Sequence, residues 1–154
     1  MTKGVSPLEM TAAYAAIAND GVYIEPTIYT KVLDKDGNIV LDKEPKERRV
    51  VSPQIAYIMK DVLRSTAYEH TGGNAVVKGQ ATAGKTGTTD YKADFWFVGF
   101  SNYYATGTWM GNDSPKITIP QSSWLAAKLW GHIMTKIHQD KESKPQFAEP
   151  EGIV

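Results

Sequence analysis

Cysteine is absent from all 154 residues, which excludes disulfide bonds and metal sites built on thiolates. Neither sign of charge is in excess, because 17 lysines and arginines balance 17 aspartates and glutamates. Nucleic-acid binding needs a clustered basic field, so the composition gives no support to a nucleic-acid partner. The three histidines, His70, His132 and His138, lack the spacing of a zinc site. We therefore expect neither a metal nor a cofactor.

Long apolar runs are also missing. No stretch is long enough to cross a bilayer, and none resembles a signal peptide. The length and the 42% hydrophobic content are typical of one globular domain.

Two predicted helices begin with the same device, a serine that can cap followed by a proline at the first helical position. The first starts at Ser6 and runs to about residue 19, with Glu9 completing a capping box. The second runs over residues 52–68. Its apolar residues recur at the spacing of one buried helical face: Ile55, Ile58, Met59, Val62 and Leu63.

Strand-like segments fill most of the remainder. Residues 23–41 predict a hairpin that turns at 36–38, and residues 42–49 a solvated loop. Three strands at 80–89, 94–101 and 104–111 have short links, which favours antiparallel neighbours. After a loop over 112–121, Ser122 or Ser123 caps a helix to about residue 138, with one apolar face formed by Leu125, Leu129, Ile133 and Ile137. This order predicts an α+β fold, an antiparallel sheet with flanking helices.

The segment Ala83-Gly84-Lys85-Thr86-Gly87-Thr88-Thr89 carries the candidate chemistry. Gly87 leaves room beside the strand, and Lys85 lies two residues earlier on the same face. The hydroxyls of Thr86 and Thr88 flank the glycine. We expect Lys85, Thr86 and Thr88 to border one open groove at a sheet edge, with Thr86 on the opposite face from Lys85 and Thr88. Such a groove suits an extended ligand that carries a carboxylate.

The same lysine also belongs to a second motif. Residues Gly79 to Thr86 satisfy G-x-x-x-x-G-K-[ST], the phosphate-binding loop of nucleotide-binding proteins. That loop needs a helix directly after it, whereas glycine and β-branched threonines follow here, and these are poor helix formers. Nucleotide binding through Gly79–Thr86 is therefore an alternative that the context disfavours.

Most of the chain resembles the transpeptidase domain of class A, bifunctional penicillin-binding proteins. Residues 6–23 resemble a helix and turn of that family, residues 83–89 its Lys-Thr-Gly strand, and residues 94–100 and 106–111 the two strands that follow. The resemblance implies the fold shared by serine β-lactamases and D,D-transpeptidases, with residues 1–140 as the C-terminal portion of the domain and 141–154 as an extended or disordered tail. A free-standing serine β-lactamase is disfavoured by the aromatic strand pair and by the absence of a nucleophile motif.

The resemblance implies a serine enzyme that cross-links peptidoglycan stem peptides and is acylated by β-lactams. It assigns Lys85 to the catalytic cleft, where it attracts the substrate carboxylate and assists proton transfer. Thr86 and Thr88 bind that carboxylate, the backbone N–H of Thr88 is one oxyanion-hole donor, and Gly87 keeps the approach open. The expected location is the outer side of the bacterial cytoplasmic membrane, with an N-terminal anchor outside this chain.

The family's two other motifs, S-x-x-K and S-x-N, occur at none of the eight serines. We therefore expect a C-terminal part that is inactive alone and has the missing N-terminal half of the domain as its partner, supplied by the same or another chain. A non-catalytic module that binds a peptide along its sheet edge is the alternative of a different class.

Overall fold

A three-stranded antiparallel sheet in the order β5-β6-β7 forms the centre of the computed structural model, which describes residues 4–69, 73–112, 114, 117, 118, 120 and 122–153. The helices of the described residues are α1 (Pro7–Ala18), α2 (Pro53–Glu69) and α3 (Trp124–Ile137), with single 3-10 turns at η1 (Gly73–Ala75) and η2 (Asp90–Lys92). The strands are β1 (Val22–Ile24), β2 (Lys31–Leu33), β3 (Ile39–Asp42), β4 (Glu47–Arg49), β5 (Ala83–Thr88), β6 (Asp94–Phe100) and β7 (Ala105–Gly111). The expected α+β class and the three antiparallel strands are confirmed. The loop expected over 112–121 lies largely outside the described residues.

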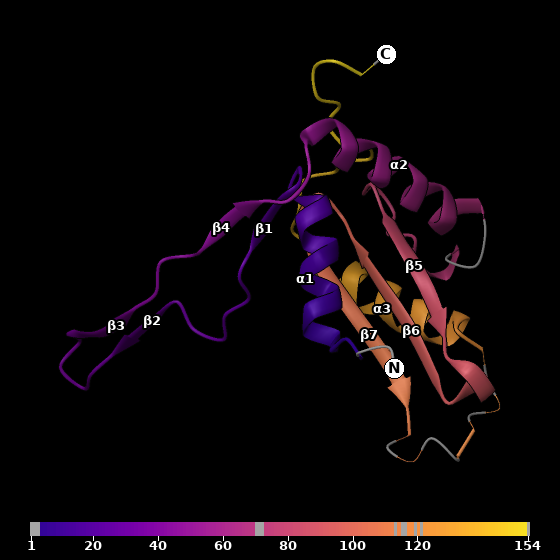
Figure 1. Cartoon of the computed structure of the whole chain (residues 1–154), viewed down its shortest axis with the longest axis horizontal. Coiled ribbons are helices and arrows are strands. Elements are labelled where there is room, and N and C mark those ends of the chain that lie inside the picture. The colour runs from indigo at the N-terminus through magenta and orange to yellow at the C-terminus, as the bar shows by residue number, and fades with distance from the viewer. Residues whose placement is uncertain are drawn as a thin grey trace.

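Helices cover both faces of the sheet (Figure 1). On one face α1 lies over β6 and β7 and α2 over β5, while α3 lies on the other face. The core on the α3 side joins Phe95 and Phe97 of β6 to Trp130 and Met134 of α3. On the α1 side, Leu63 of α2 and Phe100 of β6 are buried together.

The capping box that the sequence predicts is present at the start of α1. The backbone amide of Glu9 donates to the Ser6 hydroxyl at 3.2 Å, and the Ser6 amide donates to the Glu9 carboxylate at 2.8 Å. Two backbone donors that a helix start leaves unpaired are thereby satisfied.

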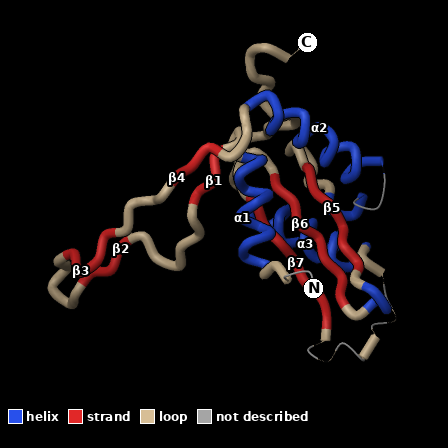
Figure 2. Tube along the Cα trace, in the orientation of Figure 1, coloured by secondary structure: helices blue, strands red, loops and turns tan. Residues whose placement is uncertain are grey.

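The hairpin predicted over residues 23–41 forms over the shorter range 31–42, because residues 22–24 pair with β4 instead, and it projects from the body as a two-stranded arm (Figure 2). β2 pairs with β3, and the Asp34 carboxylate accepts the amides of Asp36 and Asn38 in the turn. The predicted loop at 42–49 is in part wrong, because Glu47–Arg49 forms β4 and pairs with β1. β4 consists of charged residues and is exposed along its whole length. It therefore lacks the alternating apolar pattern by which a strand is predicted from sequence.

The buried faces predicted for the second and last helices are also wrong. In α2, Ile55, Ile58, Met59 and Val62 are exposed, and of the predicted set only Leu63 is buried. In α3, Leu129, Ile133 and Ile137 are exposed, whereas small residues, Trp130 and Met134 face the sheet. In both helices small side chains are among the buried residues, and most of the large aliphatic side chains lie outward.

Residues 141–153 run along the end of the sheet beside α2. The Lys144 carbonyl accepts the Ala81 amide at 2.7 Å and the Asn102 side-chain amide at 3.1 Å. Phe147 contacts Phe100 of the core with ring centroids 5.6 Å apart. The Tyr57 hydroxyl of α2 donates to Glu149 at 3.2 Å, so this segment ties the β6–β7 turn to α2.

Candidate active site

The Lys85 strand, β5, lies at one edge of the sheet, and β6 is its neighbour among the described strands. Lys85 pairs with Val98 and Gly87 with Trp96, so these four residues share the face on which α1 lies. Thr86 pairs with Phe97 and Thr88 with Phe95, on the opposite face. The expectation that Lys85 and Thr88 share a face is wrong, because residues three apart on a strand point to opposite faces.

A groove of about 390 Å³ runs between this face and α1. It has Lys85, Thr86 and Gly87 on one side and Tyr14 of α1 on the other; its full lining is Val5, Met10, Tyr14, Lys85, Thr86, Gly87, Thr89, Asp94, Trp96 and Val98. The structure thus brings three of the four predicted residues together, and the Thr88 side chain is not part of the lining. Thr89, which the sequence analysis did not assign, continues the face of Lys85 and Gly87.

The Lys85 side chain is exposed and lines the groove. It donates to the Thr86 carbonyl at 3.0 Å and approaches the Thr86 hydroxyl at 3.4 Å. The side chain is exposed, so it can rotate toward a ligand at little cost. Gly87 is already close to its neighbour, because a Cβ there would lie 3.3 Å from the Trp96 Cβ. The strand therefore offers a cation beside a stretch of backbone that no side chain covers.

Thr66 of α2 shows which backbone groups face outward from β5. Its hydroxyl donates to the Gly84 carbonyl, so the backbone of Gly84 points away from β6. Backbone directions alternate along an antiparallel strand, and those of Thr86 and Thr88 therefore also point outward. The amide of Thr88 is directed to the open edge although its side chain lies off the groove.

A polar cluster around Asp94 also lines the groove. Its carboxylate accepts the Trp109 indole N–H at 2.8 Å and the Thr89 hydroxyl at 3.0 Å. In the opposite wall, burial raises the pKa of the Tyr14 phenol above its ordinary value, so Tyr14 stays neutral. Lys85 is therefore the cation of this groove.

Other features of the described residues bear on the expected chemistry. No serine lines the groove, and Ser101 is instead buried against His138. The described histidines, aspartates and glutamates form no group of three or more that could hold a metal ion. Among the described helices, none is both long and apolar enough to cross a membrane.

The nucleotide-binding alternative fails on geometry. Lys85 and Thr86 lie inside strand β5, and the strand continues to Thr88 before one short 3-10 turn. A phosphate-binding loop requires a helix whose N-terminal amides surround the phosphate. No helix starts at Lys85 or Thr86.

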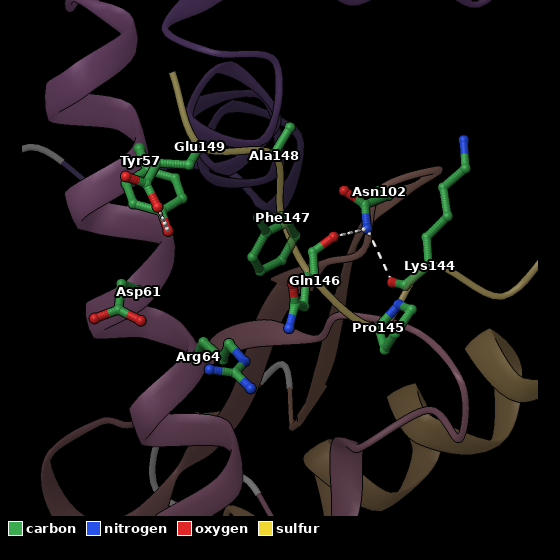
Figure 3. Close-up of a pocket in the computed structure, with 10 residues that line it drawn as sticks. All are labelled: Tyr57, Asp61, Arg64, Asn102, Lys144, Pro145, Gln146, Phe147, Ala148 and Glu149. Carbon is green, nitrogen blue, oxygen red and sulfur yellow. Dashed lines mark hydrogen bonds between the residues drawn. The ribbon is translucent and has the colours of Figure 1, made fainter. Parts of the chain in front are cut away.

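A larger hollow of about 780 Å³ lies elsewhere, between α2 and the end of the chain (Figure 3). Its wall includes Tyr57, whose hydroxyl donates to Glu149 at 3.2 Å, and Asn102, whose amide donates to the backbone of Gln146 at 3.0 Å. None of the predicted site residues lines it. The smaller groove at Lys85 is therefore the candidate site.

An antiparallel sheet between helical layers, with Lys-Thr-Gly on its edge strand, is typical of penicillin-binding transpeptidase domains. The family model described as the penicillin binding protein transpeptidase domain matches residues 3–112. The chain belongs to this family.

Relatives and solved structures agree with this assignment. The chain is 37% identical to penicillin-binding protein 1A of Clostridium botulinum (strain Langeland) over 99% of its length, and 40% identical to that of Clostridium acetobutylicum over 86%. It covers only 18% and 16% of those proteins.

Among structures, penicillin-binding protein 1A of Haemophilus influenzae has the same fold, with a TM-score of 0.84 and 24% identity over 97% of this chain and 28% of that one. The D,D-transpeptidase domain of an Eggerthella lenta peptidoglycan glycosyltransferase has a TM-score of 0.73 and 27% identity, over 89% of this chain and 33% of that one.

Proposed function

We propose that this chain is the C-terminal part of a serine D,D-transpeptidase that cross-links peptidoglycan stem peptides and is acylated by β-lactams. Residues 1–140 form its share of the catalytic domain, and 141–154 are the tail. The observation that carries the proposal is the position of Lys85, Thr86 and Gly87 at an open sheet edge, in a chain of the penicillin-binding family. The parent enzyme acts on the outer side of the cytoplasmic membrane, held by an anchor outside these residues.

The reaction has two acyl-transfer steps. A serine oxygen from the rest of the domain attacks the carbonyl of the penultimate D-alanine, the C–N bond breaks, and the terminal D-alanine leaves with a proton. An amine of a second stem peptide then attacks the ester, and the serine recovers its proton. This chain contributes Lys85, which attracts the terminal carboxylate and assists proton transfer, and Thr86 as a carboxylate ligand.

The backbone of β5 has two further roles in this proposal. The outward amide of Thr88 is one donor of the oxyanion hole, and it stabilises charge that develops on the carbonyl oxygen. Gly87 allows the extended substrate to approach the strand, as in other cases where a peptide adds to a sheet edge.

Substitution of Lys85 in the parent enzyme tests the proposal. Removing one preorganised contact to a transition state costs about 3–4 kcal/mol, so Lys85→Ala should slow acylation by a β-lactam roughly a hundred- to a thousandfold. Lys85→Arg keeps the charge but cannot give up a proton, so it should slow acylation less than alanine if the lysine acts mainly through its charge. Lys78→Ala, an exposed lysine outside the groove, is the matched control.

The measurement is the second-order rate of labelling by a fluorescent penicillin. Equal rates for Lys85→Ala and the control would remove Lys85 from the active site. The 154-residue chain alone should take no label, because it carries no S-x-x-K serine. Stem-peptide binding without any labelling of the parent would favour the non-catalytic peptide-binding module.

A further inference from the structure

The most regular apolar row of the sequence lies on the surface of α2. Ile55, Ile58, Met59 and Val62 are between 38% and 54% exposed, although their i, i+3, i+4, i+7 spacing is typical of a buried face. The buried residues of α2 are instead Ala56, Lys60, Leu63 and Ala67. Adjacent exposed apolar side chains in one line mark an interaction surface. We call these four exposed residues the α2 row.

The α2 row leads directly to the candidate active site. Thr66 is four residues beyond Val62 and seven beyond Met59, so it continues the same side of the helix. Its hydroxyl donates to the carbonyl of Gly84, the residue before Lys85. A segment that covers the α2 row therefore also borders the edge of β5 where the groove begins.

The comparisons indicate how much polypeptide is available to cover this surface. The chain spans about a third of the solved Eggerthella lenta transpeptidase-domain chain and less than a fifth of the clostridial proteins. Most of the domain thus lies outside these residues. In the proposed function, that remainder also brings the serine to Lys85.

We propose that the α2 row binds an apolar segment from the remainder of the transpeptidase domain and holds that segment against the edge of β5. The inference rests on the proposed function only for the identity of that segment. No charged residue belongs to the row, while Asp61 and Arg64 face the separate hollow on the other side of α2. The covering segment accordingly presents apolar side chains.

Cysteine labelling of the folded parent protein tests whether the α2 row is buried there. These 154 residues contain no cysteine, so Met59→Cys and Val62→Cys each add one thiol, and the unsubstituted parent gives the background. Ile28→Cys is the control, because Ile28 in the arm is 99% exposed. We expect a maleimide to label both row variants at least about tenfold more slowly than the control, and equally fast after denaturation.

The outcomes separate the possible occupants. Labelling of both row variants at the control rate would overturn the proposal. Protection that disappears on dilution would overturn it in favour of a second copy, and protection that depends on an added protein would overturn it in favour of a separate partner. Protection that is independent of concentration in the purified parent supports it.

The same samples distinguish this inference from the proposed function. Lys85→Ala should suppress penicillin labelling and leave the protection of Met59→Cys unchanged. If penicillin does not label the parent protein while the α2 row stays protected from the maleimide, the result contradicts the proposed function and supports the docking surface. If penicillin labels the parent and the row is freely reactive, the docking surface fails alone.

Discussion

The half-buried ion pair between Lys60 of α2 and Asp20, which follows α1, predicts an unequal response to loss of its two partners. The Lys60 ammonium lies 2.5 Å from the Asp20 carboxylate, and the Lys60 side chain is only 5% exposed whereas that of Asp20 is 61% exposed. Lys60 also lies 5.7 Å from the centre of the Phe147 ring. The pair therefore joins α1, α2 and the end of the chain, and it helps to hold the helix that carries Thr66 to β5.

Substituting Asp20 leaves a buried ammonium without its counter-charge. Breaking a fully buried pair in this way costs about 3–5 kcal/mol, and a charged hydrogen bond alone contributes about 1.5–3 kcal/mol. Asp20→Asn keeps an acceptor oxygen and tolerates the positive φ of 50° at this position. We therefore expect Asp20→Asn to lower the free energy of unfolding by about 2–3 kcal/mol.

Substituting Lys60 leaves a carboxylate that water already reaches. Lys60→Met keeps most of the apolar stem and removes the desolvated charge, so it should cost less than about 1 kcal/mol. The double variant should resemble Lys60→Met, because Asp20 no longer has a buried partner. Urea unfolding followed by tryptophan fluorescence measures all three. A larger loss for Lys60→Met than for Asp20→Asn, or simple additivity, would refute the reasoning.

Three further changes test other parts of the fold. Gly131→Ala places a Cβ 2.4 Å from the Asn74 carbonyl and should cost about 1–3 kcal/mol in urea unfolding; Gly73→Ala, where nothing lies within 4 Å, is the neutral control. Ser101→Ala removes a buried hydroxyl that bonds His138 at 2.8 Å and the Tyr103 amide at 3.0 Å, and should cost about 1–3 kcal/mol, whereas the exposed Ser122→Ala should not. Hydrogen bonds from the Ser6 backbone and then the Ser6 side chain lower the pKa of Glu9, so its stabilising contribution is present above the ordinary glutamate pKa and is lost as the pH falls through the lowered value. The stability difference between the wild type and Glu9→Gln should therefore shrink on acidification, and a difference that grows would contradict the capping box.

Local signals in the sequence predicted the start of α1, the hairpin turn and the central strands. The Ser6 cap and Glu9 predicted the start of α1, the residues around Gly37 predicted the hairpin turn, and three strand-like runs with short links predicted the antiparallel sheet. These features depend on neighbours within a few residues, so the chain order alone contains them. The candidate lysine and its glycine were identified in the same way.

Only the tertiary structure decided which surfaces meet. The period of the α2 row shows that these residues share one side of the helix, but not whether the sheet lies on that side. The buried side of α2 carries Ala56, Leu63 and Ala67, and the row is turned outward. Likewise Tyr14 and Lys85 share a groove because α1 crosses the sheet, a contact between residues far apart in the chain that no local pattern encodes.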